Sequence, residues 1–316
     1  MVRFGVTVPF DPTPLAEYEG IYQEIAALGY SDVWTAEASG TDGFVPLALA
    51  AAWAPGLRLG TGIVPSFTRG PATLAMCVAT LAEAAPGRFQ FGLGTSSDVI
   101  VERWNSIPFV EPYKRNRDMV RFLKAALAGE KVTETYDTFS VQGFRLERPP
   151  SVIPPILVAA LRPGMLRLAG RLGDGAVINW LSAEDVKRIV PEVGDGKEVV
   201  CRIYVCPSED AATVRSSAKM LIAAYLNVEV YARFQEWLGR GPKLQGMWEA
   251  WKSGDRKAAV EAIGDDVVDE LVVHGSPQQC KDHIQAYVDN GVTVPVVMPL
   301  PFGLKTMDAV RLLAPS

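Results

Sequence analysis

Histidine and cysteine, the side chains that most often hold metals or form disulfides, are scarce in this sequence. Its 316 residues include two histidines and four cysteines, and no two cysteines stand in a CxxC pair. His274 precedes a helix start and His283 lies within a predicted helix, so neither follows a strand. We expect no metal site, and we expect the cysteines to be small buried apolar side chains. They are Cys77, Cys201, Cys206 and Cys280.

The sequence also lacks a long apolar run, a strong charge and a targeting segment. Its longest apolar stretch, 46–55, is far too short to cross a bilayer. The formal net charge of −5 gives no general affinity for nucleic acid. Residues 1–6 have no basic segment followed by a long apolar one, and they indicate a first strand instead. We therefore expect a cytoplasmic protein with no membrane or nucleic-acid partner.

Familiar catalytic motifs are missing as well. No HExxH, GxSxG or P-loop occurs. No cluster of acidic residues and histidines follows the predicted strands, which argues against metal-dependent hydrolysis. No GxGxxG turn follows the first predicted strand, which disfavours an open doubly wound sheet, the alternative fold.

What the chain does have is an alternation of short β-rich runs with longer helical ones. Hydrophobic residues make up 48% of the chain, enough for a sizeable core. Strands alternating with helices predict a parallel sheet, and eight such units point to an α/β fold, a single-domain (β/α)8 TIM barrel over residues 1–316. The predicted strands are 4–9, 32–35, 57–64, 89–93, 156–160, 175–178, 199–205 and 294–298.

Two segments interrupt this alternation. Residues 131–146 alternate apolar and polar side chains around a central turn, and they predict a hairpin that serves as a lid or an edge insertion. Residues 225–262 are helical, with Trp237, Trp248 and Trp251 in an otherwise charged stretch. We expect these tryptophans to pack between helices, and a substrate mouth or a subunit contact is the alternative.

The active site of such a barrel lies at the carboxyl ends of its strands. The residues that follow the predicted strands are mostly glycines and small hydroxyl residues, with few ordinary catalytic groups. This composition suits an enzyme whose chemistry is supplied by a bound organic cofactor. Arg162 opens the helix after the fifth strand and, with the helix N-terminus, offers a place for a phosphate. A solvated cap residue is the alternative role for Arg162.

Three ordered runs resemble the luciferase-like monooxygenase superfamily. They are residues 57–65 (LRLGTGIVP), 68–72 (TRGPA) and 87–96 (GRFQFGLGTS), and the helix start at 275–277 (GSP) is similar too. Within the superfamily the sequence is most similar to the F420-dependent branch, which includes methylenetetrahydromethanopterin reductases. The resemblance implies an F420-dependent oxidoreductase that moves a hydride to or from C5 of the deazaflavin, with FMN as the alternative cofactor.

The resemblance also implies a set of cofactor-binding residues. In the F420 branch the third strand ends in a non-proline cis peptide behind the deazaflavin ring, and Gly62-Ile63 occupies that place. Thr35, the loop after the fourth strand and the loop after the fifth strand are expected to line the same site. The residues of those two loops are Thr95, Ser96 and Ser97, then Ala160, Leu161 and Arg162.

The chain departs from its alcohol- and sugar-oxidising relatives at three places, one of which is Leu161-Arg162, where those relatives have paired glycines. Those relatives carry a catalytic histidine after the second strand, where this chain has Glu37. They carry Gly-Glu where this chain has Ser96-Ser97. Glu37 is the candidate acid or base if burial raises its pKa, and a loop cap or a partner for Arg69 is the alternative. Reduction of an unsaturated or imine-like substrate is therefore favoured over alcohol or sugar oxidation.

Two other functions stay open from the sequence. One is an FMN-dependent monooxygenase, and the other is a catalytically degenerate flavin-binding barrel. The substrate is expected to be a small molecule, apolar or aromatic, because aromatic residues follow several strands. The resemblance also implies a homodimer. The candidate pocket residues are Phe10, Trp104, Tyr113 and Trp180.

Overall fold

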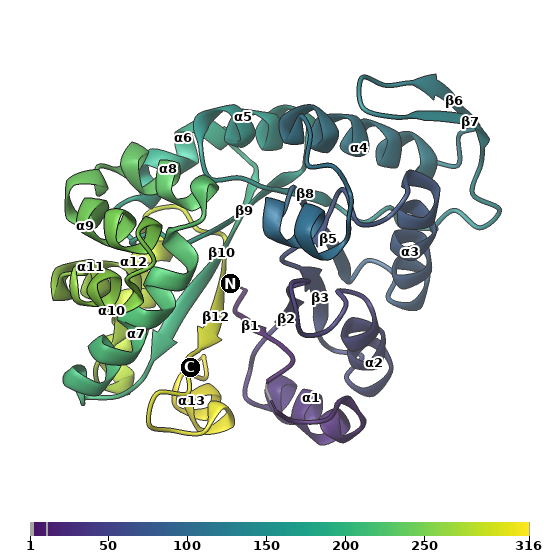
Figure 1. Cartoon of the computed structure of the whole chain (residues 1–316). Helices are drawn as coiled ribbons and strands as arrows, with labels where there is room; N and C mark the ends of the chain where they lie inside the picture. Colours follow the sequence, from purple (N-terminus) through teal and green to yellow (C-terminus); the bar gives the residue numbers. More distant parts are fainter. Residues whose placement is uncertain (1–2, 11, 316) are drawn as a thin grey trace.

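The computed structural model describes residues 3–10 and 12–315. Eight parallel strands form a closed ring, because β10 pairs with both β9 and β12 and the others pair in chain order (Figure 1). This is the predicted (β/α)8 barrel, and all eight predicted strands are present. They are β1 (Gly5–Thr7), β2 (Asp32–Thr35), β3 (Arg58–Thr61), β5 (Phe89–Gly94), β8 (Ile156–Ala159), β9 (Gly175–Asn179), β10 (Glu198–Cys206) and β12 (Val294–Pro299).

Helices surround the ring, and the largest apolar core lies between them and the strands. Alternate strand residues such as Val33, Leu59 and Ile178 face outward into this core, since side chains on a strand alternate between its two faces. Cys201, Cys206 and Cys280 are buried, as expected. The surrounding helices are α1 (Tyr18–Ala27), α2 (Val45–Trp53), α3 (Pro71–Ala84), α4 (Pro112–Leu127), α5 (Pro163–Leu172), α6 (Val186–Val193), α7 (Ala211–Leu226), α12 (Pro277–Asp289) and α13 (Thr306–Leu312).

The other strand face fills the inside of the barrel. Trp34 spans the interior, and a Cβ added at Gly60 would collide with its ring. Glycine at 60 is therefore required for the tryptophan to fit. Five aliphatic side chains complete the plug. They are Leu157, Val177, Val200, Val294 and Val296.

The predicted hairpin is formed by β6 (Val132–Thr135) and β7 (Ser140–Phe144), which pair antiparallel. Phe122 of α4 contacts the rings of Tyr136, Phe139 and Phe144 at centroid distances of 5.8–6.5 Å. The hairpin therefore packs on the outside of α4, at the edge of the barrel (Figure 1). Of the two predicted roles, this position matches an edge insertion.

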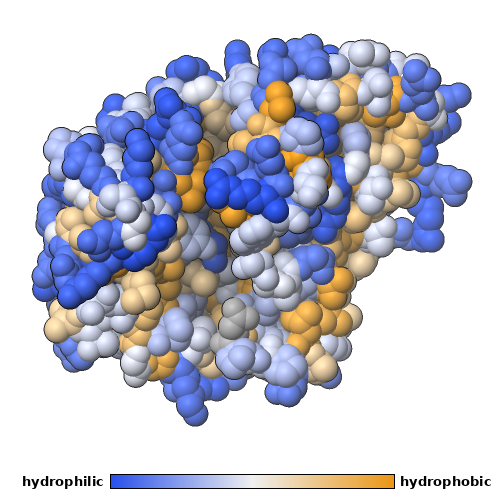
Figure 2. All heavy atoms as spheres, in the orientation of Figure 1, coloured by the Kyte–Doolittle hydropathy of each residue, from blue (hydrophilic) through white to orange (hydrophobic). Residues whose placement is uncertain are grey.

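The predicted helical segment contains α8 (Glu229–Leu238), α9 (Gly241–Lys252) and α10 (Arg256–Glu261), followed by α11 (Asp265–Leu271). Together with α7 these helices enclose a second apolar cluster. Trp237 stacks on Phe234, and Trp248 Nε1 donates to Leu226 O at 2.8 Å. The tryptophans thus pack between helices, as expected. Figure 2 shows a recess between this side of the molecule and the β1–α4 side, with hydrophobic atoms along part of its walls.

A few elements differ from the sequence expectations. Helix α6 begins at Val186, after a turn in which Asp185 Oδ2 accepts from Ser182 N at 2.8 Å. The predicted strand 57–64 is interrupted after Thr61, and Val64 belongs to a separate short strand, β4 (Val64–Pro65). A π-helix over Val99–Trp104 and the short strand β11 (Val273–His274) were not predicted. Among the described residues, no helix is long and apolar enough to cross a membrane.

Candidate functional site

The peptide bond between Gly62 and Ile63 is cis, as the resemblance implies. It follows β3 directly and is tied to the end of β2. Gly62 N donates to Thr35 O at 2.6 Å, and Glu37 N donates to Ile63 O at 3.1 Å. Ile63 itself is half-buried, so an apolar side chain stands at the mouth of the barrel.

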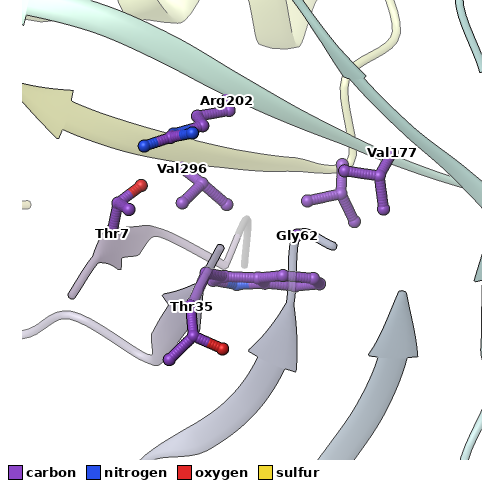
Figure 3. A pocket seen from close by; sticks show the side chains of 8 residues that line it. Thr7, Thr35, Gly62, Val177, Arg202 and Val296 are labelled. Atoms are coloured by element: carbon purple, nitrogen blue, oxygen red, sulfur yellow. The ribbon is translucent and has the colours of Figure 1, made fainter. Parts of the chain in front are cut away.

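A small hollow, open to solvent, lies beside the tryptophan plug, and its enclosed volume of about 10 Å³ has room for one water molecule. Its lining residues lie on β1, β2, β9, β10 and β12 and directly after β3, and most of them are apolar or small. Figure 3 shows Thr7 and Arg202 extending toward the same part of this hollow from β1 and β10. The lining residues are Thr7, Trp34, Thr35, Gly62, Val177, Val200, Arg202 and Val296.

Three polar groups of this lining have buried atoms without a hydrogen-bond partner among the described residues. They are Thr7 Oγ1, Trp34 Nε1 and Arg202 Nε. Thr35 differs, because its hydroxyl donates to Gly43 O at 2.8 Å. Buried polar atoms are paired in most folded proteins, so an unpaired group beside a hollow indicates a place for a ligand.

Glu37 is engaged at both of its carboxylate oxygens. Oε1 accepts from Arg69 Nη1 at 2.6 Å, and Oε2 accepts from Gly43 N at 2.9 Å. The Arg69 guanidinium also lies over the Phe44 ring, 5.2 Å from its centroid. These contacts hold the loop between β2 and α2 against the segment after β4. Both alternatives named for Glu37, the loop cap and the Arg69 pair, are thus present together.

The loop after β5 lies beside the cis peptide. A Cβ added at Gly94 would stand 2.8 Å from Ile63 Cδ1 and 2.9 Å from Ala159 Cβ, so Gly94 is needed for this close approach. Thr95, Ser96 and Ser97 follow and are half-buried. Ser96 has φ 62°, an uncommon backbone conformation for a residue other than glycine. The structure therefore places this predicted loop next to Gly62-Ile63.

The loop after β8 leads into helix α5. Ala160 is buried, Leu161 is half-buried, and Arg162 is exposed at the N-cap position of the helix. The first turn of α5 contains no acidic residue. A helix N-terminus attracts anions through its free N–H groups and its dipole, and Arg162 adds a charge of the same sign.

The four predicted pocket aromatics are not gathered around the hollow. Phe10 is buried against Tyr18, whose hydroxyl donates to Phe10 O at 2.9 Å. Trp104 and Tyr113 are exposed, on the π-helix and on α4. Trp180 is 1% exposed and stacks on Tyr204 at 4.0 Å. The Arg202 guanidinium also lies over the Tyr204 ring, 5.5 Å from its centroid. Tyr204 therefore contacts both Trp180 and Arg202.

Sequence reasoning missed Arg202, Thr7 and Trp34 because it considered only residues that follow strands. Arg202 is the only charge in the apolar run from Val199 to Val205. A lone charge inside a run that is otherwise buried is itself a signal, because charged residues are rarely buried unless they are paired. Neither histidine lies at the hollow, and His274 Nε2 is 2.9 Å from Asp269 Oδ1. Within the described residues, no group of three His, Cys, Asp or Glu side chains is placed to hold a metal.

Comparisons with known proteins agree with this geometry. The family model for luciferase-like monooxygenases matches residues 2–294. A 5,10-methylenetetrahydromethanopterin reductase of Methanolobus tindarius is 28% identical, over 99% of this chain and 98% of its own. The structure is similar to that of a coenzyme F420-dependent tetrahydromethanopterin reductase from Methanopyrus kandleri, with TM-score 0.81, 21% identity and coverage of 99% and 97%. It is also similar to the monooxygenase RslO1 from Streptomyces bottropensis, with TM-score 0.67, 20% identity and coverage of 99% and 97%.

Proposed function

We propose, from the premise that the chain belongs to the luciferase-like monooxygenase family, that it is an F420-dependent oxidoreductase. It would move a hydride between C5 of the deazaflavin and a small organic substrate. The observation that carries the proposal is the similarity over 99% of the chain to a 5,10-methylenetetrahydromethanopterin reductase. The structural similarity to a coenzyme F420-dependent tetrahydromethanopterin reductase supports the same cofactor.

The residues at the mouth fit a flat ring with an anionic tail. Half-buried Ile63 offers an apolar contact for a ring face, and Gly94 keeps the neighbouring strand end close to it. The hydroxyl residues Thr95 and Ser97 flank this surface. The N-terminus of α5, with Arg162 and no acidic residue in its first turn, suits a phosphate. The donor set therefore matches both parts of such a cofactor.

When bound, the deazaflavin supplies the hydride chemistry, and the chain supplies position and polarity. We propose that Ile63 and the loop 94–97 orient the ring, and that Ala160, Leu161 and Arg162 hold its tail. Thr35 stands at the end of β2 beside Gly62 and is proposed to contact the same ring. The tryptophan plug below the hollow excludes water from that side of the reacting atoms.

Glu37 is the candidate acid or base, and its role is tested by Glu37→Gln. If Glu37 transfers a proton, this variant loses about 10²-fold or more in kcat. If it only holds Arg69 and Gly43, the amide keeps one acceptor and the loss stays below about tenfold. Arg69→Gln separates the two roles, because it removes the ion pair and leaves the carboxylate in place.

A titration of purified protein with F420, and separately with FMN, tests the cofactor. We expect F420 to bind more tightly, as measured by quenching of its fluorescence. Tight FMN binding with no detectable F420 binding would overturn the proposal and favour the FMN monooxygenase, which would then consume oxygen with reduced FMN. If the barrel is degenerate, F420H2 is not oxidised by any substrate, and Glu37→Gln and Ser97→Ala leave the protein indistinguishable from wild type.

Four further features belong to the same proposal. The substrate is a small molecule, and the protein is a homodimer located in the cytoplasm. The chain forms one domain over residues 1–316. The dimer is tested by the mass in light scattering, and a monomer at micromolar concentration would contradict it.

A further inference from the structure

Arg202 points into the barrel from the middle of β10. Its neighbours Cys201 and Ile203 belong to the outer core, whereas Val200 belongs to the cluster inside the barrel. Because strand side chains alternate, Arg202 shares the inner face with Val200. It is therefore a cation placed within the barrel wall, where the lining is otherwise apolar.

The guanidinium of Arg202 has no carboxylate partner among the residues that the structure describes. Its contacts are with Met298 Sδ, 3.0 Å from Nη2, and with the face of the Tyr204 ring at 5.5 Å. Its Nε is buried and unpaired. Arg202 is half-buried, so water reaches part of its guanidinium, but neither a thioether nor an aromatic ring neutralises the charge, and an anionic ligand would do so.

Two neutral donors line the same hollow as this cation. Thr7 is 6% exposed and Trp34 is 3% exposed, and neither Thr7 Oγ1 nor Trp34 Nε1 has a partner among the described residues. An indole N–H and a guanidinium only donate hydrogen bonds, and a threonine hydroxyl is able to donate one. All three groups are therefore able to donate a hydrogen bond to a ligand oxygen, and the positive charge of Arg202 favours an anionic oxygen.

We propose that the substrate of this enzyme carries a carboxylate-class anionic oxygen group, which Arg202 binds together with Thr7 and Trp34. The aliphatic lining by Val177, Val200 and Val296 would contact the apolar part of the same molecule. This inference rests on the proposed function, since it takes the barrel mouth to be the redox site. It adds the substrate class, which the predicted apolar pocket did not include.

The test compares benzoate with benzamide, two probes of similar size and shape that differ in charge. Binding is measured by calorimetry on the wild-type protein, first without cofactor and then loaded with F420. We expect benzoate to bind about tenfold more tightly than benzamide, since charge-assisted bonds to arginine are about twice as strong as neutral ones. Equal binding of the two probes by the wild type would overturn the proposal.

Variants locate the preference. Arg202→Gln is expected to bind both probes equally, and Arg202→Lys is expected to keep part of the preference. The matched control is Arg188→Gln, since Arg188 lies over the Trp237 ring at 4.4 Å on the surface and should leave the preference intact. If Arg202→Gln keeps the wild-type preference, the proposal is wrong. Thr7→Val is expected to weaken benzoate binding and serves if Arg202→Gln does not fold.

F420 itself carries anionic groups, so its affinity separates substrate binding from cofactor binding. Arg202→Gln is expected to bind F420 within about twofold of wild type. A loss of about tenfold would make Arg202 a cofactor contact and would contradict the substrate assignment. If the protein binds no F420 at all, the proposed function fails, yet the benzoate comparison on the cofactor-free protein still decides the anion site.

Discussion

The arginines at the amino end of the barrel and Arg202 on the inner face of β10 differ in their charged partners. At the amino end, Arg3 precedes β1, and Asp32, Arg58 and Glu198 begin β2, β3 and β10. Arg3 donates to Glu198, Arg3 Nε lies 3.7 Å from Asp32 Oδ2, and Arg58 Nε lies 4.0 Å from Asp32 Oδ1. Two arginines thus face two carboxyl groups. Arg202 has no carboxylate partner among the described residues, and it lines the hollow together with Thr7 and Trp34.

The difference separates a structural region from a binding region. Arg3 and Arg58 have carboxylate partners, whereas Arg202 has none among the described residues. In barrels of this kind the amino face contributes stability and the carboxyl face carries the chemistry. Each prediction below treats one end of the barrel and asks whether stability or ligand binding changes.

We expect the largest loss of stability from Arg3→Met at the amino end of the barrel. The change leaves Glu198 and Asp32, whose side chain is 1% exposed, without their common cation. Removing one partner of a buried pair costs about 3 kcal/mol of unfolding free energy. Urea unfolding measures this loss of unfolding free energy. The affinity of the folded variant for F420 is expected to equal that of the wild type. A loss of affinity without a loss of stability would reverse the assignment of the two ends.

At the carboxyl end, Gly94→Val is expected to affect the cofactor. The added side chain would push Ile63, which lies 2.8 Å from the position of the new Cβ. We expect F420 binding to weaken about tenfold, which corresponds to about 1.4 kcal/mol. A fluorescence titration measures this, with Gly164→Ala as the control, since nothing lies near its added Cβ. Unchanged affinity would argue that the ring does not rest at Ile63.

Arg202→Met is the counterpart of Arg3→Met and should behave differently. It removes a cation without a carboxylate partner among the described residues and substitutes an apolar side chain of similar length. We expect the unfolding free energy to stay level or rise by about 0.5–1 kcal/mol, because the cost of burying the charge disappears. A loss as large as that of Arg3→Met, measured by the same urea unfolding, would show that Arg202 is structural.

The smallest effect concerns pH. Burial raises the pKa of Asp32 and of Glu198 above their ordinary values of 3.8 and 4.5, and the neighbouring arginines oppose the shift. A carboxyl group with a raised pKa in the folded state favours folding below its ordinary pKa, and this contribution is lost as the pH rises through the raised value.

The slope of unfolding free energy against pH tests this point. Glu198→Gln should flatten the fall in stability from pH 4.5 upward, because the amide does not titrate. Glu184→Gln, at an exposed position, is the control and should leave the slope unchanged. An equal slope in Glu198→Gln and wild type would place the pH dependence elsewhere.

The sequence was sufficient for the architecture and for part of the site. The eight strands, the hairpin and the helical segment follow from local periodicity, which each segment carries in its own residues. The positions of Gly62-Ile63 and the loop 94–97 were predicted from the resemblance. The predicted pocket residues Phe10, Trp104, Tyr113 and Trp180 do not line the hollow, because position after a strand does not determine the direction of a side chain.

The sequence by itself determined the barrel, because alternating strands and helices of this number close in few ways. It also determined the family, because ordered motifs run along most of the chain. Only the tertiary structure decided that Glu37 is held by Arg69 and Gly43. Only the structure placed Arg202, Thr7 and Trp34 in one lining, because β12 pairs with both β1 and β10 when the ring closes.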